Sequence, residues 1–369
     1  MTASHGANGV LNWAAFVLPG VTHARRFAQI NPYFFGFSSY LGPVVNLSYS
    51  DSAVLEVAHT LRIGSLRYPG GSPSNHWNLS AGRWIDGQGD PNERCNSQPL
   101  GTFTPEKYME GLGQKLRAPP IWNINVVSLP TAERLVQIDA LKAMGVPVTY
   151  LELGNEQANP CGETGASSDY LAAVAPIVAR TRKLFPSAKI AIIGSWANPA
   201  DVSPLVNWTG CARMLAKHRA LFDAVTVHQY MPGNNTLMSY PADQRRTVTL
   251  ATAEPLLRFH VAMVAENIGA DVPILLDEYN WGGHWEGSTT WSDRSETALR
   301  GALMSSYILS AIGTHGGVAA LNWYSLFQQD GNAWSEWASC VKVSNQVCVR
   351  ARALACVFVF LLPSFPHGS

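Results

Sequence analysis

The chain has 369 residues, of which 47% are hydrophobic and 14% charged, which excludes an intrinsically disordered protein and allows a large buried core. Its 26 Lys and Arg balance 26 Asp and Glu, so no overall field attracts nucleic acid or an anionic membrane. The largest basic clusters are Arg245-Arg246 and the segment from Arg180 to Lys183, and we therefore expect no nucleic-acid partner.

Short β-like runs alternate with helix-like stretches from about residue 30 to residue 327, a pattern that indicates a parallel sheet covered by helices. The predicted strands are Tyr33–Ser38, Ser65–Tyr68, Ile121–Val126, Val148–Leu153, Ile190–Gly194, Ala224–Gln229, Ile274–Asp277 and Ala319–Trp323. The predicted helices are Ala53–Leu61, Pro105–Leu116, Thr131–Met144, Ser168–Leu184, Cys211–Phe222, Thr252–Ile268 and Glu296–Ile312. Eight strands are the number that closes a (β/α)8 TIM barrel, and this α/β fold is our prediction.

An open, doubly wound sheet is the rival fold. It would carry a Gly-rich phosphate loop after its first strand, and Phe35-Gly36-Phe37-Ser38 is not such a loop. We assign residues 30–340 to the barrel and leave 341–369 as a C-terminal segment outside it. The apolar run Ala353–Leu362 in that segment is too short for a bilayer, which needs roughly twenty residues, so we expect no membrane span.

The six cysteines form no CxxC pair and no Cys/His metal spacing, and no His/Asp/Glu cluster has a metal spacing, so we expect no metal and no cofactor. Four glycosylation sequons begin at Asn46, Asn78, Asn207 and Asn234. They favour a secreted, extracellular or lysosome- or vacuole-like location, although the start of the chain shows no clear signal peptide. The oligomeric state is left open.

Polar residues at the carboxyl ends of the strands are the candidates for an active site, because that end of a TIM barrel holds the chemistry. They are Arg67, Asn125, Asn155, Glu156, Ser195, His228, Tyr230, Glu278, Asn322 and Trp323. Two glutamates stand out, since Thr149–Glu156 and Ile274–Glu278 each run an apolar strand into a carboxylate. Such a position is costly unless the charge is paired or used. Taken singly, Glu156 has an alternative role as a helix cap, and Glu278 as an ion-pair partner of an arginine.

Two carboxyls that face each other across a pocket are what cleavage of a glycosidic bond requires, one as acid and one as nucleophile. We expect Arg67 to lie near Glu278 and keep it ionised, while Asn155 and the apolar strand leave Glu156 less solvated. Tyr230 is expected to donate a hydrogen bond to Glu278. The 12 Trp and 12 Tyr residues are consistent with sugar stacking, and equally with packing in a large domain.

The motifs Leu153-Gly-Asn-Glu156 and Asp277-Glu278-Tyr-Asn resemble those of clan A glycoside hydrolases, whose acid/base follows an Asn at strand four and whose nucleophile ends strand seven. The segment Leu66–Asn78, with Arg67-Tyr-Pro-Gly-Gly, is similar to strand two of families 79 and 51, the heparanase-like β-glucuronidases and the arabinofuranosidases. Phe35-Gly-Phe and His228-Gln-Tyr230 fit the same pattern. The resemblance covers about residues 30–327.

The resemblance implies a retaining mechanism with Glu156 as acid/base and Glu278 as nucleophile. The substrate-binding residues that it implies are Arg67, Asn75, Asn155, His228, Tyr230, Trp281 and Trp323. Among them, Asn155 would contact the sugar 2-hydroxyl, Arg67 and Tyr230 would orient Glu278, and Trp323 would form the subsite floor. These families usually add a β-sandwich after the barrel, and because only about 40 residues follow strand eight we expect it to be absent or truncated here.

The sequence therefore predicts a retaining O-glycoside hydrolase that acts on polysaccharide or glycoconjugate sugars, with a β-glucuronidase or heparanase-like activity as the first expectation. An α-L-arabinofuranosidase is the alternative within enzymes. A carbohydrate-binding barrel without catalysis is the alternative from another class, although a binder has no need of both Glu156 and Glu278.

Overall fold

The computed structural model of the chain describes residues 34–39, 48–61, 63–85, 101–114, 120–156, 167–197, 210–231, 242–281, 294–314, 316–324, 327–329, 340–343 and 346–347. All of them belong to one compact unit that spans residues 31–369. Cys211 in this unit takes part in a disulfide bond.

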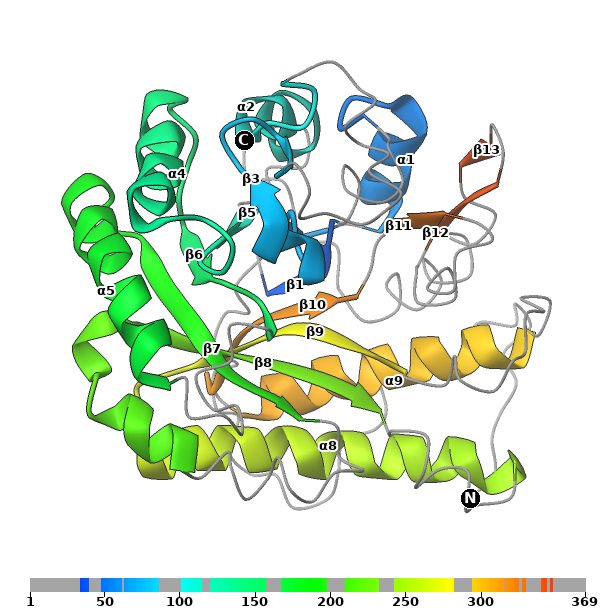
Figure 1. The fold of residues 1–369 in the computed structure, drawn as a ribbon. Coiled ribbons are helices and arrows are strands. Elements are labelled where there is room, and N and C mark those ends of the chain that lie inside the picture. Colours follow the sequence, from blue (N-terminus) through cyan, green and yellow to red (C-terminus); the bar gives the residue numbers. More distant parts are fainter. Residues whose placement is uncertain are drawn as a thin grey trace, which may run out of the picture. The chain divides into compact units, whose positions relative to one another are not determined.

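Eight parallel strands close into a barrel in the order β1-β10-β9-β8-β7-β6-β5-β2 (Figure 1). Their bounds are β1 Phe35–Ser38, β2 Ser65–Tyr68, β5 Pro120–Ile124, β6 Tyr150–Leu153, β7 Lys189–Ala197, β8 Ala224–Met231, β9 Ile274–Trp281 and β10 Val318–Trp323. Each of the eight predicted strands is present, and the prediction of a (β/α)8 barrel is confirmed.

The barrel interior is closely packed at its amino-terminal end by small and branched side chains. The buried cluster there consists of Ile121, Ala191, Ala224, Leu275 and Ala320. Gly36 of β1 also faces a crowded interior, since a Cβ at this position would lie 2.2 Å from the carbonyl oxygen of Ser65 on β2. Only glycine permits so close an approach of two strands, which explains the Phe-Gly-Phe pattern of β1.

Helices cover the outside of the strands, among them α4, α5, α8 and α9 (Figure 1). The bounds are α1 Ser52–Thr60, α2 Pro105–Tyr108, α4 Thr131–Ala143, α5 Ser167–Leu184, α8 Ala242–Asn267 and α9 Arg294–Gly313. None of the helices in the part of the chain that the structure describes has the length and apolar character needed to cross a bilayer.

Three predicted helices differ from the structure. The helix expected over Pro105–Leu116 becomes a π-helical turn at Met109–Gly113, where a Cβ on Gly111 would lie 2.2 Å from the Tyr49 carbonyl oxygen. The one expected over Cys211–Phe222 is helical over 210–216 and ends in the 3₁₀ turn Arg219–Leu221. Helix α8 starts at Ala242, ten residues before the predicted Thr252. The prediction missed these first turns because they lack the apolar periodicity that marks a helix.

Two small sheets accompany the barrel. Strands β3 (Trp77–Asn78) and β4 (Arg83–Trp84) form a hairpin after β2. Strands β11 (Phe327–Gln329), β12 (Cys340–Val343) and β13 (Gln346–Val347) form a three-stranded sheet. The predicted boundary between residues 340 and 341 falls within β12, and the division into two domains stays a prediction.

Candidate active site

A bulge in β9 brings two consecutive acidic residues into the barrel mouth. In the pairing of β8 with β9, Val227 lies opposite Leu276, but the next residue, His228, lies opposite Glu278. Strand β9 therefore has one extra residue, Asp277, at this point. The pairing of β9 with β10 shifts in the same segment. A bulge suspends the alternation of side chains between the two faces, and Asp277 and Glu278 consequently both contact Arg67.

Arg67 of β2 lies at the centre of the site and is completely buried. Its Nε and Nη2 donate to the Glu152 carboxylate at 2.5 and 2.7 Å, and Nη2 also donates to Asn155 Oδ1 at 2.7 Å. Its Nη1 donates to Glu278 Oε1, and Nε lies 3.5 Å from Asp277 Oδ2. Burial opposes the charge, but the surrounding carboxylates raise the pKa of Arg67 well above its usual value, so the guanidinium stays charged.

His228 of β8 links the two predicted catalytic glutamates. Its Nδ1 lies 2.7 Å from Glu156 Oε1 and 3.7 Å from Glu278 Oε2, and its Nε2 lies 3.0 Å from Asp277 Oδ1. Burial alone would lower the pKa of His228, but Glu278 and Asp277 raise it well above the usual value. The ring is therefore an imidazolium at neutral pH, and the described part of the site holds two cations, Arg67 and His228.

Glu156 follows β6 by three residues, Glu278 lies within β9, and the two side chains face each other. One carboxylate oxygen of each, with a nitrogen of His228, lies within a group whose atoms are all within 4.8 Å of one another. The two glutamates differ in exposure, at 24% for the Glu156 side chain and 4% for Glu278. The expectation that Glu156 is the less solvated carboxyl is therefore wrong, since Glu156 is the more open to solvent, while the expected contact of Arg67 with Glu278 is present.

Two further acids complete the site and were not among the predicted residues: Glu152 on β6 and Asp277 on β9. Both are completely buried. Burial raises the pKa of Glu152 to about 8, and Asp277 adds to this rise. Burial also acts to raise the pKa of Asp277, but the charges of Arg67 and His228 outweigh it and hold that pKa below its usual value.

Two buried amides, Asn75 and Asn155, lie next to each other beside Arg67. Asn75 Oδ1 accepts a hydrogen bond of 3.0 Å from the Asn155 backbone N–H, which fixes Asn155 beside Arg67. The Nδ2 donors of Asn75 and Asn155 have no hydrogen-bond partner in the described part of the chain, although both residues are completely buried. A buried donor without an acceptor costs about 1–3 kcal/mol, so these two are available to a ligand oxygen.

The structure gives fewer contacts for the remaining predicted residues. Trp323 is 2% exposed and its ring packs edge-on against Tyr279 at 5.1 Å, so its described contact belongs to the core and the role of subsite floor stays a prediction. The side chains of Ser195, Tyr230 and Trp281 lie outside the described residues.

Two groups of three side chains have the composition of a metal site, Glu152 with His228 and Asp277, and Glu156 with His228 and Glu278. Both depend on His228, which as an imidazolium has no lone pair to offer. The Arg67 guanidinium also occupies carboxyl oxygens of Glu152 and Glu278 that a metal ion would need. The donor set therefore does not fit a metal ion.

We expect replacement of Arg67 by Gln to lower the free energy of unfolding by about 3 kcal/mol at pH 7, because it leaves buried carboxylates without their main partner. Those carboxyls would then have raised pKa values in the folded state of the variant. The difference in the free energy of unfolding between the variant and the wild type should therefore shrink as the pH falls toward 5. Urea unfolding at both pH values measures this. Arg180→Gln, which breaks an exposed pair with Asp139, is the control and should change little. Equal effects of the two variants would contradict the prediction.

No protein-family model and no curated protein sequence matches the chain. Solved structures do. An α-L-arabinofuranosidase from Thermotoga maritima, in complex with arabinose, superposes with a TM-score of 0.61 and 18% identity over 88% of this chain and 70% of that one. A family 51 α-L-arabinofuranosidase from Bifidobacterium longum gives 0.66 and 15%, over 90% of this chain and 73% of that one.

A β-D-glucuronidase from Dictyoglomus thermophilum gives a TM-score of 0.52 and 12% identity over 90% of this chain, which spans 51% of that enzyme. At sequence identities this low, the superpositions establish a common architecture alone. The chain thus has the (β/α)8 barrel fold of these arabinofuranosidases and glucuronidases.

Proposed function

We propose that the protein is a retaining O-glycoside hydrolase that works by double displacement. The observation that carries this proposal is the approach of the Glu156 and Glu278 carboxylates, with one oxygen of each within 4.8 Å of the other. Retaining glycosidases place their two carboxyl groups about 5–5.5 Å apart, whereas inverting ones leave about 6.5–9.5 Å for a water molecule. Oxygens within 4.8 Å of each other leave no space for a water molecule between them, which needs about 2.7 Å to each, and this supports retention.

In the first step Glu278 attacks the anomeric carbon, the glycosidic C–O bond breaks, and Glu156 gives its proton to the departing oxygen. In the second step the Glu156 carboxylate takes a proton from water, the water oxygen attacks the same carbon, and Glu278 leaves. The charge on Arg67 supports Glu278 as the ionised nucleophile. His228 beside Glu156 stabilises the carboxylate that remains after proton donation.

Glu156 suits the acid/base role because its side chain is the more exposed of the two, so that water and leaving groups reach it. The free Nδ2 donors of Asn75 and Asn155 suit hydroxyl oxygens of the sugar. A substrate that fills them recovers the cost of burying these donors. That recovery favours a hydroxylated ring in the position between the glutamates.

The charges at the site favour a neutral sugar over a uronate. Both cations that the structure describes there, Arg67 and His228, are already engaged by carboxylates of the protein. A glucuronide would need a further cation for its own carboxylate, whereas an arabinofuranoside needs none. We therefore propose an α-L-arabinofuranosidase ahead of a β-glucuronidase.

A panel of aryl glycosides tests the proposal, with arabinofuranoside, glucuronide, glucoside and xyloside incubated with the purified protein. We expect turnover of one of them, the arabinofuranoside first, and proton NMR of the earliest product should show the anomer of the substrate. Inversion would overturn the double displacement. Absence of turnover by folded protein, together with calorimetric binding of oligosaccharides, would instead identify a non-catalytic carbohydrate-binding barrel.

A further inference from the structure

We propose that Glu152 is a positioning residue of this site, which shares one proton with Asp277 and in that form holds Arg67 in place to support Glu278. The inference deepens the proposed function and rests on it for its catalytic consequence. Its structural part, a carboxyl that stays protonated at neutral pH, stands independently of any activity.

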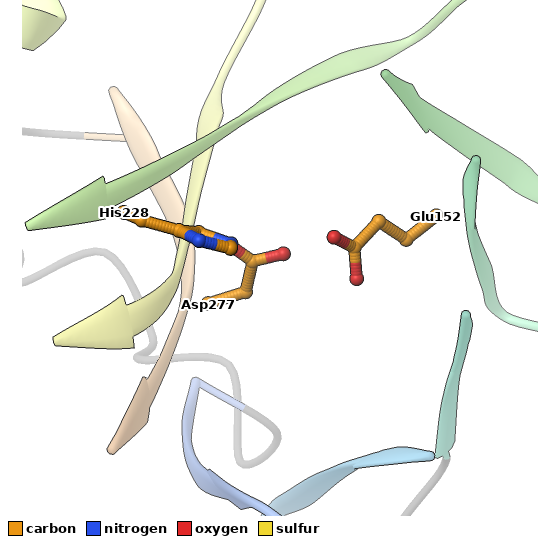
Figure 2. A group of neighbouring side chains, drawn as sticks. All are labelled: Glu152, His228 and Asp277. Carbon is orange, nitrogen blue, oxygen red and sulfur yellow. The ribbon is translucent and has the colours of Figure 1, made fainter. Parts of the chain in front are cut away.

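The geometry brings the two carboxyls together from opposite sides of the barrel, Glu152 from β6 and Asp277 from β9 (Figure 2). An oxygen of each lies within 4.8 Å of the other, with His228 completing the group. His228 Nε2 lies 3.0 Å from Asp277 Oδ1, yet neither Asp277 oxygen has a hydrogen-bond donor aligned with it in the described part of the chain. A proton on Glu152 supplies that donor.

Charge balance requires such a proton. Four carboxyls meet two cations in this site, so full ionisation would leave a net charge of 2 − 4 = −2 in a largely buried volume. Uncompensated buried charge is strongly destabilising. Glu156 is the most exposed of the four carboxyls, so water screens it. Glu152, Asp277 and Glu278 are buried with the two cations, and one proton on the Glu152–Asp277 pair brings the sum of these five groups to zero.

The surroundings place that second proton on Glu152. Arg67 from β2, His228 from β8, and Asp277 and Glu278 from β9 are the charged groups near it, and the Tyr170 hydroxyl of α5, a neutral group, donates to the Leu153 carbonyl oxygen. Burial raises the pKa of Glu152 to about 8, while Arg67 and His228 hold that of Asp277 low. The two groups titrate as a pair, which holds one proton at neutral pH.

The proton matters for Glu278 because both glutamates compete for one guanidinium. A neutral Glu152 still accepts hydrogen bonds from Arg67 Nε and Nη2, which fixes the guanidinium plane. Its missing charge leaves the attraction of Nη1 directed at Glu278. Ionisation of Glu152 adds a competing charge, so the support of Glu278 weakens as the pH rises through about 8.

Infrared spectroscopy of the full chain tests the proton directly. The measurement uses Glu156→Gln, so that the acid/base carboxyl contributes no band of its own. In this variant we expect the carbonyl stretch of a protonated carboxylic acid at pH 7 and its loss near pH 8. The band should be absent from the double variant Glu152→Gln/Glu156→Gln and should survive in Asp139→Asn/Glu156→Gln, a control at an exposed ion pair. Persistence of the band in Glu152→Gln/Glu156→Gln, or no such band in Glu156→Gln at pH 7, overturns the inference. If the Glu152→Gln/Glu156→Gln variant does not fold, the pH titration of the Glu156→Gln band still decides.

Kinetics test the positioning. Glu152→Gln keeps an acceptor for Arg67 and a donor for Asp277, so its kcat/KM at pH 6 should stay within about tenfold of the wild type. The decline of kcat/KM that is centred near pH 8 in the wild type should be absent from this variant. Glu152→Ala removes both contacts and should lose on the order of 10²-fold, mainly in kcat. Equal losses in the two variants would contradict positioning. If the infrared band is present but the protein has no glycosidase activity, the proposed function is wrong and the shared proton is still supported.

Discussion

Glu278→Gln is expected to lower kcat/KM by on the order of 10⁴-fold or more, because an amide cannot form the covalent glycosyl intermediate. The change is small in shape, and the amide oxygen still accepts from Arg67 Nη1, so the fold should be retained. Initial rates with the best aryl glycoside of the panel measure the loss, and circular dichroism checks the fold.

A matched control separates this effect from a general change of charge. Glu266→Gln alters an exposed glutamate of α8 and should leave the rate unchanged. A 2-deoxy-2-fluoro glycoside with a good leaving group, which slows the second step more than the first, should label Glu278 of the wild type, and peptide mass mapping locates the label. A label on another carboxylate, or a loss below tenfold in Glu278→Gln, would remove Glu278 as the nucleophile.

The barrel could be predicted because each of its strands is a short apolar run between breaks, a signal that depends on local sequence. Where the local signal is weak, prediction failed. The π-helical turn at Met109–Gly113 follows from the contact of Gly111 with the Tyr49 backbone, which lies far away in sequence. The early start of α8 at Ala242 likewise has no amphipathic pattern behind it.

In the site, Glu156 and Glu278 could be singled out because each ends an apolar strand. Glu152 carried a usable signal that was missed, since a charge between Leu151 and Leu153 on a barrel strand must face the interior and find a partner there. Asp277 carried none. Strict alternation points it away from Glu278, and only the bulge in β9 turns both toward Arg67.

The four acids of the barrel mouth find their cationic partners in Arg67 and His228. Each predicted role of a carboxylate depends on the protonation of the others, because two cations serve four acids. In the proposed mechanism the nucleophile and the acid are the same residue type, and the difference between them lies in the contact of Glu278 with Arg67 and the exposure of Glu156.

Glu156→Ala should separate the two steps of the reaction. With substrates whose leaving group needs a proton, we expect kcat/KM to fall on the order of 10³-fold, the usual contribution of general acid catalysis. With a highly activated aryl leaving group the first step needs little help, so the glycosyl-enzyme forms and then waits for a water molecule that no base activates. A burst of aryl alcohol followed by a slow steady rate is the expected trace in stopped-flow absorbance.

Azide provides the decisive measurement, since this anion attacks without a general base and can enter the space that the Glu156 side chain leaves at the solvent-exposed edge of the site. The steady rate of Glu156→Ala should rise with azide, and the product should be a glycosyl azide that keeps the anomeric configuration of the substrate. Glu133→Ala, a change at an exposed glutamate of α4, should show neither the burst nor the rescue. If Glu156 is the acid/base, its loss leaves a glycosyl-enzyme that azide can attack from the face on which Glu156 stood. An unchanged rate with azide, or a product with the opposite anomeric configuration, would therefore show that Glu156 is not the acid/base.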